Sequence, residues 1–207
     1  MAAHWYFDFI SPFAYLAWPR VRALATRHEI ALRPIMFAGL LGHHGHKGPA
    51  EIAPKRTFTY RHVLWQAKQR GVPRACPPTH PYTPLLARRL CGAAAATPEA
   101  ITAIFDWVWG QGRAVDSPEA IAPLAATLGI HDPAALAAPA VKDALRANYD
   151  AALAAGVFGV PTLAIDGELF WGEDALGFAE AFLADRRVLS TPEMQAAATW
   201  PVGASRT

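Results

Sequence analysis

Strand-like patterns lie at the two ends of the chain, and helical patterns fill residues 41–149 between them. Residues 4–10 are aromatic and favour a β-strand, apolar residues then recur at helical spacing over Phe13–Arg27, and Ile30–Met36 favours a second strand. Pro19 is expected to kink or restart the helix. A β-α-β unit this short favours a right-handed crossover and parallel strands.

The C-terminal end complements this unit with a hairpin. The pattern predicts a helix over Val141–Ala155 that ends at Gly156, strands over Thr162–Ile165 and Glu168–Trp171 joined by a turn at Asp166–Gly167, and a last helix over about Asp174–Ala184. The chain is therefore predicted to form an α/β domain from residues 1–40 and 150–190. An all-helical insertion over residues 41–149 interrupts that domain, and residues 191–207 are predicted to be a mobile tail.

Turn and cap residues divide the insertion further. A helix is predicted over Phe58–Gln69, and the prolines of Pro73–Pro84 predict a loop, because proline lacks a backbone donor and blocks a helix. Three more helices are predicted where a capping residue precedes a proline, at Thr97-Pro98, Ser117-Pro118 and Asp132-Pro133.

Charge and hydropathy exclude several classes of protein. The chain has 19 Lys+Arg and 17 Asp+Glu, and the net charge of +2 is too small for a protein that mainly neutralises phosphates. We therefore expect no nucleic-acid ligand. Every apolar stretch is interrupted before about 18 residues accumulate, which predicts no membrane span. The first residues show no basic leader, so a cytoplasmic location is expected.

Cysteine and histidine spacing argues against metal and dithiol chemistry. Cys76 and Cys91 are 15 residues apart and form no C-x-x-C motif, so neither a disulfide framework nor a redox pair is predicted. Histidines gather at His43, His44 and His46 without an acid or cysteine at ligand spacing. We expect no metal site, and interpret this loop as solvated or substrate-facing.

Ser11 is the first candidate functional residue, because it stands between a buried strand and a helix that Pro12 begins. A hydroxyl at that position lies in the partial positive field of unpaired backbone N–H groups, where a thiolate would be stabilised. A helix cap is the alternative, since Ser117 and other residues of this chain precede proline in the same way. Residue type leaves both interpretations open.

Two further candidates lie in the C-terminal part. Pro161 opens a strand, and a cis bond there would leave the backbone of Val160 able to pair with an extended peptide-like ligand. Residues 170–174 precede the last helix, where Asp174 is either its N-cap or an acidic clamp for an ammonium group.

Three segments together resemble the 2-hydroxychromene-2-carboxylate isomerase family: Y-F-D-F-I-S-P-F-A-Y-L-A at positions 6–17, F-G-V-P-T at positions 158–162 and W-G-E-D at positions 171–174. That family is related to kappa-class glutathione transferases and, in fold, to the DsbA oxidoreductases. The resemblance extends to about residue 186. It implies a thioredoxin-like domain with a large all-helical insertion and a pocket between the two parts.

The resemblance implies glutathione as the cofactor and Ser11 as the catalytic residue beside its thiolate. Val160, ahead of a cis-Pro161, would pair with the cysteinyl backbone, and Gly172, Glu173 and Asp174 would lie near the γ-glutamyl end. The implied reaction is cis-trans isomerisation of an aromatic-catabolic intermediate by transient thiolate addition, of the type that converts 2-hydroxychromene-2-carboxylate to trans-o-hydroxybenzylidenepyruvate. The partners implied are a small aromatic carboxylate and a second copy of the chain in a homodimer.

The substrate side departs from the family pattern. His46 replaces an asparagine, His80 replaces a tyrosine, and no basic residue near Leu41 replaces a lysine. His46, Lys47 and His80 remain the expected substrate-binding residues. In place of N-D-R or S-D-R after W-G, the chain has E-D-A at positions 173–175.

Two other functions are compatible with the same residues. A kappa-like glutathione transferase or peroxidase would consume the thiolate, whereas the isomerase returns it. A non-catalytic module could instead use the cleft for an extended peptide, because the tetrapeptide Ser11–Ala14 contains no protein thiol.

Overall fold

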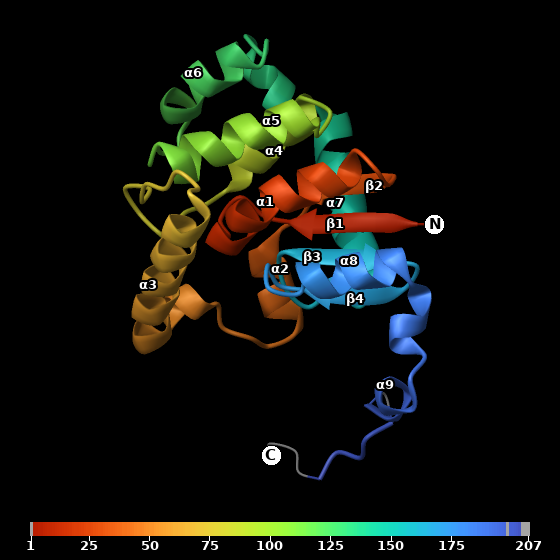
Figure 1. The fold of residues 1–207 in the computed structure, drawn as a ribbon. Helices are drawn as coiled ribbons and strands as arrows, with labels where there is room; N and C mark the ends of the chain where they lie inside the picture. Colours follow the sequence, from red (N-terminus) through yellow and green to blue (C-terminus); the bar gives the residue numbers. More distant parts are fainter. Residues whose placement is uncertain (1, 198, 204–207) are drawn as a thin grey trace.

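The computed structural model describes residues 2–197 and 199–203. At its centre lies a four-stranded sheet in the order β2-β1-β3-β4 (Figure 1). β1 (Ala3–Phe7) and β2 (Ile30–Pro34) are parallel, whereas β3 (Thr162–Ile165) is antiparallel to both β1 and β4 (Glu168–Trp171). Both ends of the chain therefore contribute to one sheet, and the predicted α/β fold class is confirmed.

Helices cover both faces of this sheet. Because successive side chains of a strand point to opposite faces, Trp5 packs on one side and Tyr6 on the other. Trp5 stacks on Trp18 of α1 (Pro12–Ala25), in the same cluster as buried residues of α8 (Leu176–Ala184). Tyr6 packs with Ala152 of α7 (Pro139–Ala154). Both faces of the sheet are thus covered.

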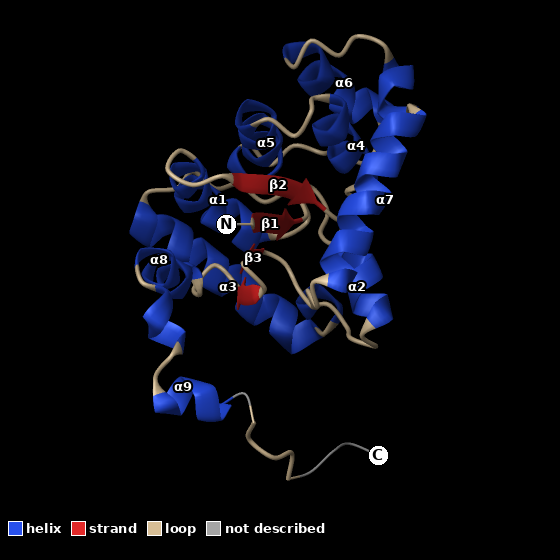
Figure 2. Cartoon of the chain, turned by 90° about the vertical axis from the view of Figure 1, so that its right-hand side faces the viewer, coloured by secondary structure: helices blue, strands red, loops and turns tan. Residues whose placement is uncertain are grey.

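The insertion packs around α1 and the β2 edge of the sheet (Figures 1 and 2). Its elements are α2 (Phe37–His43), a 3-10 turn (Pro49–Glu51), α3 (Ala53–Arg70), α4 (Leu85–Ala93), α5 (Pro98–Phe105), a π-helical turn (Asp106–Gly110), α6 (Pro118–Thr127) and a 3-10 turn (Pro133–Ala137). Thr97 and Ser117 cap α5 and α6 as predicted. Asp132 begins only a short 3-10 turn.

Helix α7 links the two parts of the molecule, because it packs against α4 of the insertion and against β2 of the sheet (Figure 2). The division at residues 40 and 150 therefore stays a prediction. Figure 1 shows α9 (Pro192–Ala197) standing away from the body of the molecule. Part of the predicted mobile tail is thus helical, while residues 198 and 204–207 of it lie outside the described residues.

Several predicted boundaries are wrong. The last helix begins at Leu176, with Ala175 as its N-cap position, so Asp174 is not the cap. Helix α1 continues through Pro19, so the alternative of a restart there is wrong, while a kink stays a prediction. Helices α2 and α4 were not predicted, because neither has a capping side chain at its start.

Candidate active site

Ser11 lies at the N-terminus of α1, immediately after the β1 strand and its following turn. Its Oγ accepts a hydrogen bond from the backbone N–H of Ala14 at 3.2 Å, so Ser11 is a helix cap. The residue is only 7% exposed, yet it lines a cavity. Its hydroxyl proton is donated to none of the described residues and remains free for an anion at the positive end of the helix.

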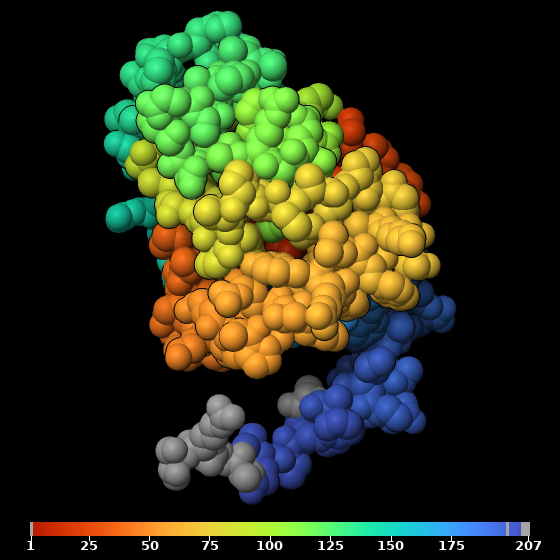
Figure 3. Space-filling view, turned by 90° about the vertical axis from the view of Figure 1, so that its left-hand side faces the viewer, coloured from red at the N-terminus to blue at the C-terminus, as the bar shows by residue number. Residues whose placement is uncertain are grey.

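The cavity beside Ser11, which we call the large cavity, has a volume of about 350 Å³. It lies between the end of β1, α2 with the turn after it, and the loop that precedes α4. Apolar side chains form much of its wall, among them Phe13, Met36, Phe37 and Leu41. In Figure 3, α3 and the loop after it face the viewer, and a hollow between them opens onto atoms of the N-terminal segment.

A second cavity of about 250 Å³, the small cavity, adjoins the first, since Phe13 and Val160 line both. All of the predicted glutathione-binding residues except Ser11 line this small cavity: Val160, Pro161, Gly172, Glu173 and Asp174. Helix α3 contributes His62 and Gln66 to the opposite side. The fold therefore brings residues 160–161 and 171–174 next to Phe13, which stands two residues after Ser11.

The Val160–Pro161 peptide bond is cis, and Val160 stands two residues before the start of β3. Neither the N–H nor the C=O of Val160 is hydrogen-bonded to any of the described residues. Unpaired backbone groups at a cavity wall are unusual in a folded protein. They can pair with the backbone of an extended ligand, as one strand pairs with another.

Glu173 and Asp174 differ in their surroundings. Glu173 is 2% exposed, and its carboxylate accepts hydrogen bonds from Arg70 and, at 3.3 Å, from Gln66, both on α3. Asp174 is exposed at the rim of the small cavity and accepts no hydrogen bond from the described residues. Glu173 therefore ties α3 to the turn after β4, whereas Asp174 is available to a ligand.

Comparison with known proteins identifies the family. A family model described as a DsbA-like thioredoxin domain matches residues 4–184. The 2-hydroxychromene-2-carboxylate isomerase of Sphingobium xenophagum is 32% identical over 188 residues, which cover 87% of this chain and 96% of that protein. The chain belongs to the 2-hydroxychromene-2-carboxylate isomerase family.

Other relatives agree with this assignment. A solved structure of a 2-hydroxychromene-2-carboxylate isomerase superposes with a TM-score of 0.75 at 26% identity, covering 97% of this chain and 100% of that one. A Caenorhabditis elegans protein named glutathione S-transferase kappa 2 is 25% identical over 207 residues, covering 87% of this chain and 90% of that protein. The predicted thioredoxin-like fold of DsbA type is confirmed, and the chain is an isomerase by family.

In this isomerase His80 lies on the wall of the large cavity and is fixed by two hydrogen bonds. Its Nε2 donates to the carbonyl oxygen of Ile10 at 2.9 Å, and its Nδ1 lies 2.7 Å from the hydroxyl of Tyr60. Burial lowers the pKa of His80, and the charge of Arg74 lowers it further, although the bond to Ile10 acts the other way. A neutral ring with a proton on Nε2 satisfies both contacts.

His46 and Lys47 are exposed and do not line the large cavity, although Gly48 and Pro49 after them do. Their predicted role in substrate binding stays a prediction. His44, in the same loop, has its Nε2 3.3 Å from the carbonyl oxygen of Val157.

A buried ion pair that the sequence did not predict lies at the wall of the large cavity. Asp8 is 1% exposed, and its Oδ2 accepts from the backbone N–H of Phe37 at 3.0 Å and from Arg88 Nη1 at 3.2 Å. Burial raises the pKa of Asp8, while Arg88 and the backbone N–H groups oppose that shift. The single acidic residue in an otherwise apolar segment could have revealed Asp8, but nothing in the sequence pointed to Arg88.

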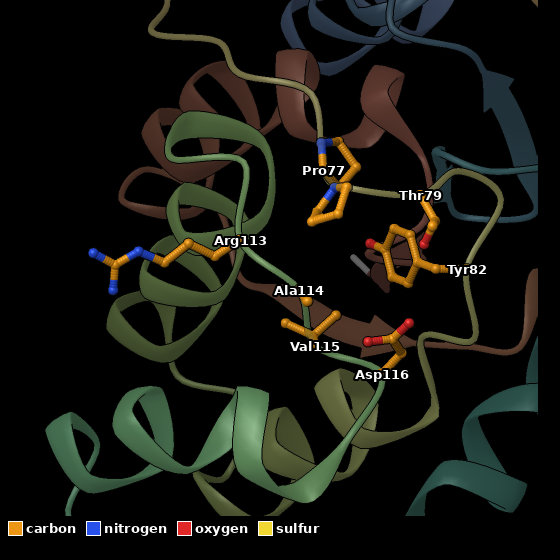
Figure 4. A pocket seen from close by; sticks show the side chains of 8 residues that line it. Pro77, Thr79, Tyr82, Arg113, Ala114, Val115 and Asp116 are labelled. Atoms are coloured by element: carbon orange, nitrogen blue, oxygen red, sulfur yellow. The ribbon is translucent and has the colours of Figure 1, made fainter.

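A third hollow is too small for a ligand. Figure 4 shows Tyr82, Thr79 and Asp116 around it, on the loop before α4 and the segment before α6. Its volume of about 10 Å³ suits at most one water molecule. The hydroxyl of Tyr82 donates to the carbonyl oxygen of Phe9 at 2.7 Å, so this tyrosine braces the end of β1.

Metal chemistry finds no support in the described part of the chain, where no three His, Cys, Asp or Glu side chains cluster closely enough to hold an ion. Within the same residues, no helix is long and apolar enough to cross a membrane.

Proposed function

We propose that this isomerase uses glutathione as its cofactor and acts on a small aromatic carboxylate of the type for which its relatives are named. The observation that carries the proposal is the adjacency of two cavities. The small one carries unpaired peptide groups, and the large one carries the free hydroxyl of Ser11. A tripeptide and an aromatic acid bound side by side would meet at Phe13 and Val160.

The residues of the small cavity fit glutathione. The free N–H and C=O of Val160 would pair with the peptide backbone of glutathione. The exposed carboxylate of Asp174 would accept its ammonium group, and Gly172 would let the backbone approach closely. Glu173 would act indirectly, because Arg70 and Gln66 already occupy its carboxylate. The unpaired Oε1 of Gln66, which is buried, is a further acceptor beside the site.

When bound, glutathione supplies a thiolate that adds to a conjugated double bond of the substrate and later leaves, so the bond can rotate in between and the cofactor returns unchanged. Ser11 would donate its free proton to that sulfur, and the N–H groups at the start of α1 would stabilise its charge. The chain has no thiol of its own at this place, since neither Cys76 nor Cys91 lines either cavity.

The large cavity would hold the aromatic substrate. Phe13, Phe37 and Leu41 offer apolar contact for the ring, and the cavity is of the size that small-molecule sites have. His80 would contact the substrate from the opposite wall, with its orientation fixed by Ile10. His46 and Lys47 would contribute if their loop folds over the bound substrate.

A transferase or peroxidase that consumes glutathione is the second candidate, and the similarity to the kappa-class protein favours it over a peptide-binding module. We further propose a cytoplasmic homodimer, because the family resemblance and the 53% hydrophobic composition suggest burial against a second copy.

Stoichiometry tests the proposal. Purified protein is supplied with 2-hydroxychromene-2-carboxylate, and product and free thiol are followed together by absorbance and by a thiol reagent. Turnover that requires glutathione and leaves its concentration constant is the expected result. One thiol lost per product would favour the transferase, and turnover that is unaffected by removing glutathione would overturn the proposal. A separate titration with glutathione and with an unrelated tripeptide distinguishes the peptide-binding module, because that module would bind both, whereas the enzyme would bind glutathione alone.

A further inference from the structure

An anionic ligand in the large cavity needs a cation on its wall, and the described residues offer one candidate there. Among the residues that line this cavity, Arg88 is the single lysine or arginine. Asp8 and Glu51 carry the acidic groups of the lining. His80 adds no positive charge near neutral pH, because burial lowers its pKa.

The guanidinium of Arg88 has donors to spare although it is buried. The residue is 6% exposed and stands in the first turn of α4. Its Nη1 donates to Asp8 Oδ2 at 3.2 Å and to the carbonyl oxygen of Ile35 at 3.3 Å. Among the described residues, none accepts from Nε or Nη2. An arginine carries five N–H donors, so three of those of Arg88 have no partner among the described residues. Neither Nε nor Nη2 is among the fully buried atoms that lack a partner, so both remain open to a ligand.

The unpaired donors match one chemical group in particular. The Nε and Nη2 edge of a guanidinium presents two parallel N–H bonds, which is the geometry that a carboxylate accepts with both oxygens. Other parts of the cavity wall are apolar. Their side chains, among them Phe13, Met36, Phe37 and Leu41, can pack against the aromatic ring of a ligand. A ligand with an aromatic body and one carboxylate therefore satisfies both parts of the wall.

We propose that Arg88 binds the carboxylate of the substrate through Nε and Nη2, and so sets the preference of the enzyme for aromatic acids over their neutral analogues. This inference rests on the proposed function for the identity of the reaction, but the binding it describes can be measured without turnover. Asp8 would hold the guanidinium in place through Nη1 and leave the opposite edge open. Arg88 would thus bind the substrate carboxylate, a role for which the sequence suggested His46 and Lys47.

Arg88 and Met36 also line a second space, of about 390 Å³, which we call the outer cavity. It lies between α4 and α7 and includes Arg146, which is exposed and forms no ion pair with the described residues. A carboxylate that bound on that side would contact Arg146 as well. Arg146 does not line the large cavity, and its replacement therefore distinguishes the two sides of Arg88.

The test compares binding of trans-2-hydroxycinnamate with that of its carboxamide by calorimetry, in the wild-type protein and in variants. The wild-type protein should prefer the carboxylate, and Arg88→Met should weaken carboxylate binding by about 10- to 100-fold. Binding of the carboxamide should change by no more than about threefold. Arg146→Gln is the matched control and should retain the wild-type preference.

Folding must be separated from binding, because Arg88→Met leaves Asp8 buried without its partner. The double variant Asp8→Asn/Arg88→Met removes both charges and should have the fold of the wild-type protein by circular dichroism. It should also have lost the preference for the carboxylate. Asp8→Asn alone keeps Arg88 and should retain that preference. If the ion pair were purely structural, Asp8→Asn and the variants that lack Arg88 would change the preference alike.

Two outcomes would overturn the inference. One is an undiminished preference for the carboxylate in both variants that lack Arg88. The other is an equal loss in Arg146→Gln, which would move the binding site to the outer cavity. Failure of the proposed function is distinguishable from both, because it would show as turnover independent of glutathione while the carboxylate preference of the wild-type protein persists.

Discussion

Replacing Ser11 by alanine removes one oxygen that caps α1 and that we propose also holds a thiolate. The Oγ caps α1 by accepting the N–H of Ala14 at 3.2 Å, and loss of such a cap costs about 1 kcal/mol of unfolding free energy. The same oxygen, as a donor, would hold the thiolate of glutathione. A hydrogen bond to a charged group contributes about 1.5–3 kcal/mol, which corresponds to about one to two units in the pKa of the bound thiol.

The expected result for Ser11→Ala is therefore a small loss of stability and a large loss of turnover. With saturating glutathione, kcat should fall by about 10- to 100-fold at neutral pH. The pKa of bound glutathione should rise, and ultraviolet absorbance of the thiolate measured against pH would report it. Urea unfolding gives the stability of the same sample.

A matched control lies elsewhere in the chain. Ser117 caps α6 with the same geometry, since its Oγ accepts the N–H of Ala120 at 3.2 Å, and it lines neither the large nor the small cavity. Ser117→Ala should have a similar loss of stability with unchanged kcat. If Ser11→Ala behaved like Ser117→Ala in both measurements, Ser11 would be a cap and nothing more.

Three further predictions concern other parts of the site. Arg70→Met should lower the unfolding free energy in urea by about 2 kcal/mol or more and weaken glutathione binding, because it leaves Glu173 buried without its partner; unchanged stability would refute this. Burial lowers the pKa of His80, so the unfolded state takes up a proton first, near its ordinary pKa of about 6.5, and the unfolding free energy should fall as the pH drops below that value. His80→Gln should reduce this fall, and identical pH profiles of the two proteins would contradict it. Iodoacetamide should label exposed Cys76 and spare Cys91, whose pKa burial raises; mass spectrometry of the native protein would reveal any labelling of Cys91.

Local signals in the sequence predicted most of the fold. Helix starts were found where a capping side chain precedes a proline, as at Ser11, Thr97 and Ser117, because that chemistry is contained in adjacent residues. Helix α4 begins after Pro84 with no cap and carries a mixture of Leu, Arg and Cys, so its start left no such signal. The start of the last helix was misplaced because Asp174 has the residue type of a cap without forming one.

The ion pairs of the candidate site could not be predicted, because they join residues that are far apart in the sequence. Arg88 reaches Asp8 across 80 positions, and Arg70 reaches Glu173 across 103. No pattern of spacing encodes such pairs, since they exist only once the helices have packed against the sheet. The sequence identified the ends of strands and helices where we propose that ligands bind, but not the helices that supply the opposite charges.

Helix α3 has a consequence for how this enzyme could change. Thr59 on this helix lines the large cavity, and His62 and Gln66, one and two turns further along, line the small cavity. These residues span only two turns of one helix. A displacement of α3 that enlarges the large cavity for a bulkier substrate would therefore also change the shape of the small cavity. If glutathione is the cofactor as proposed, new substrates would then be acquired together with a changed affinity for it, unless the variation stays in the flanking loops.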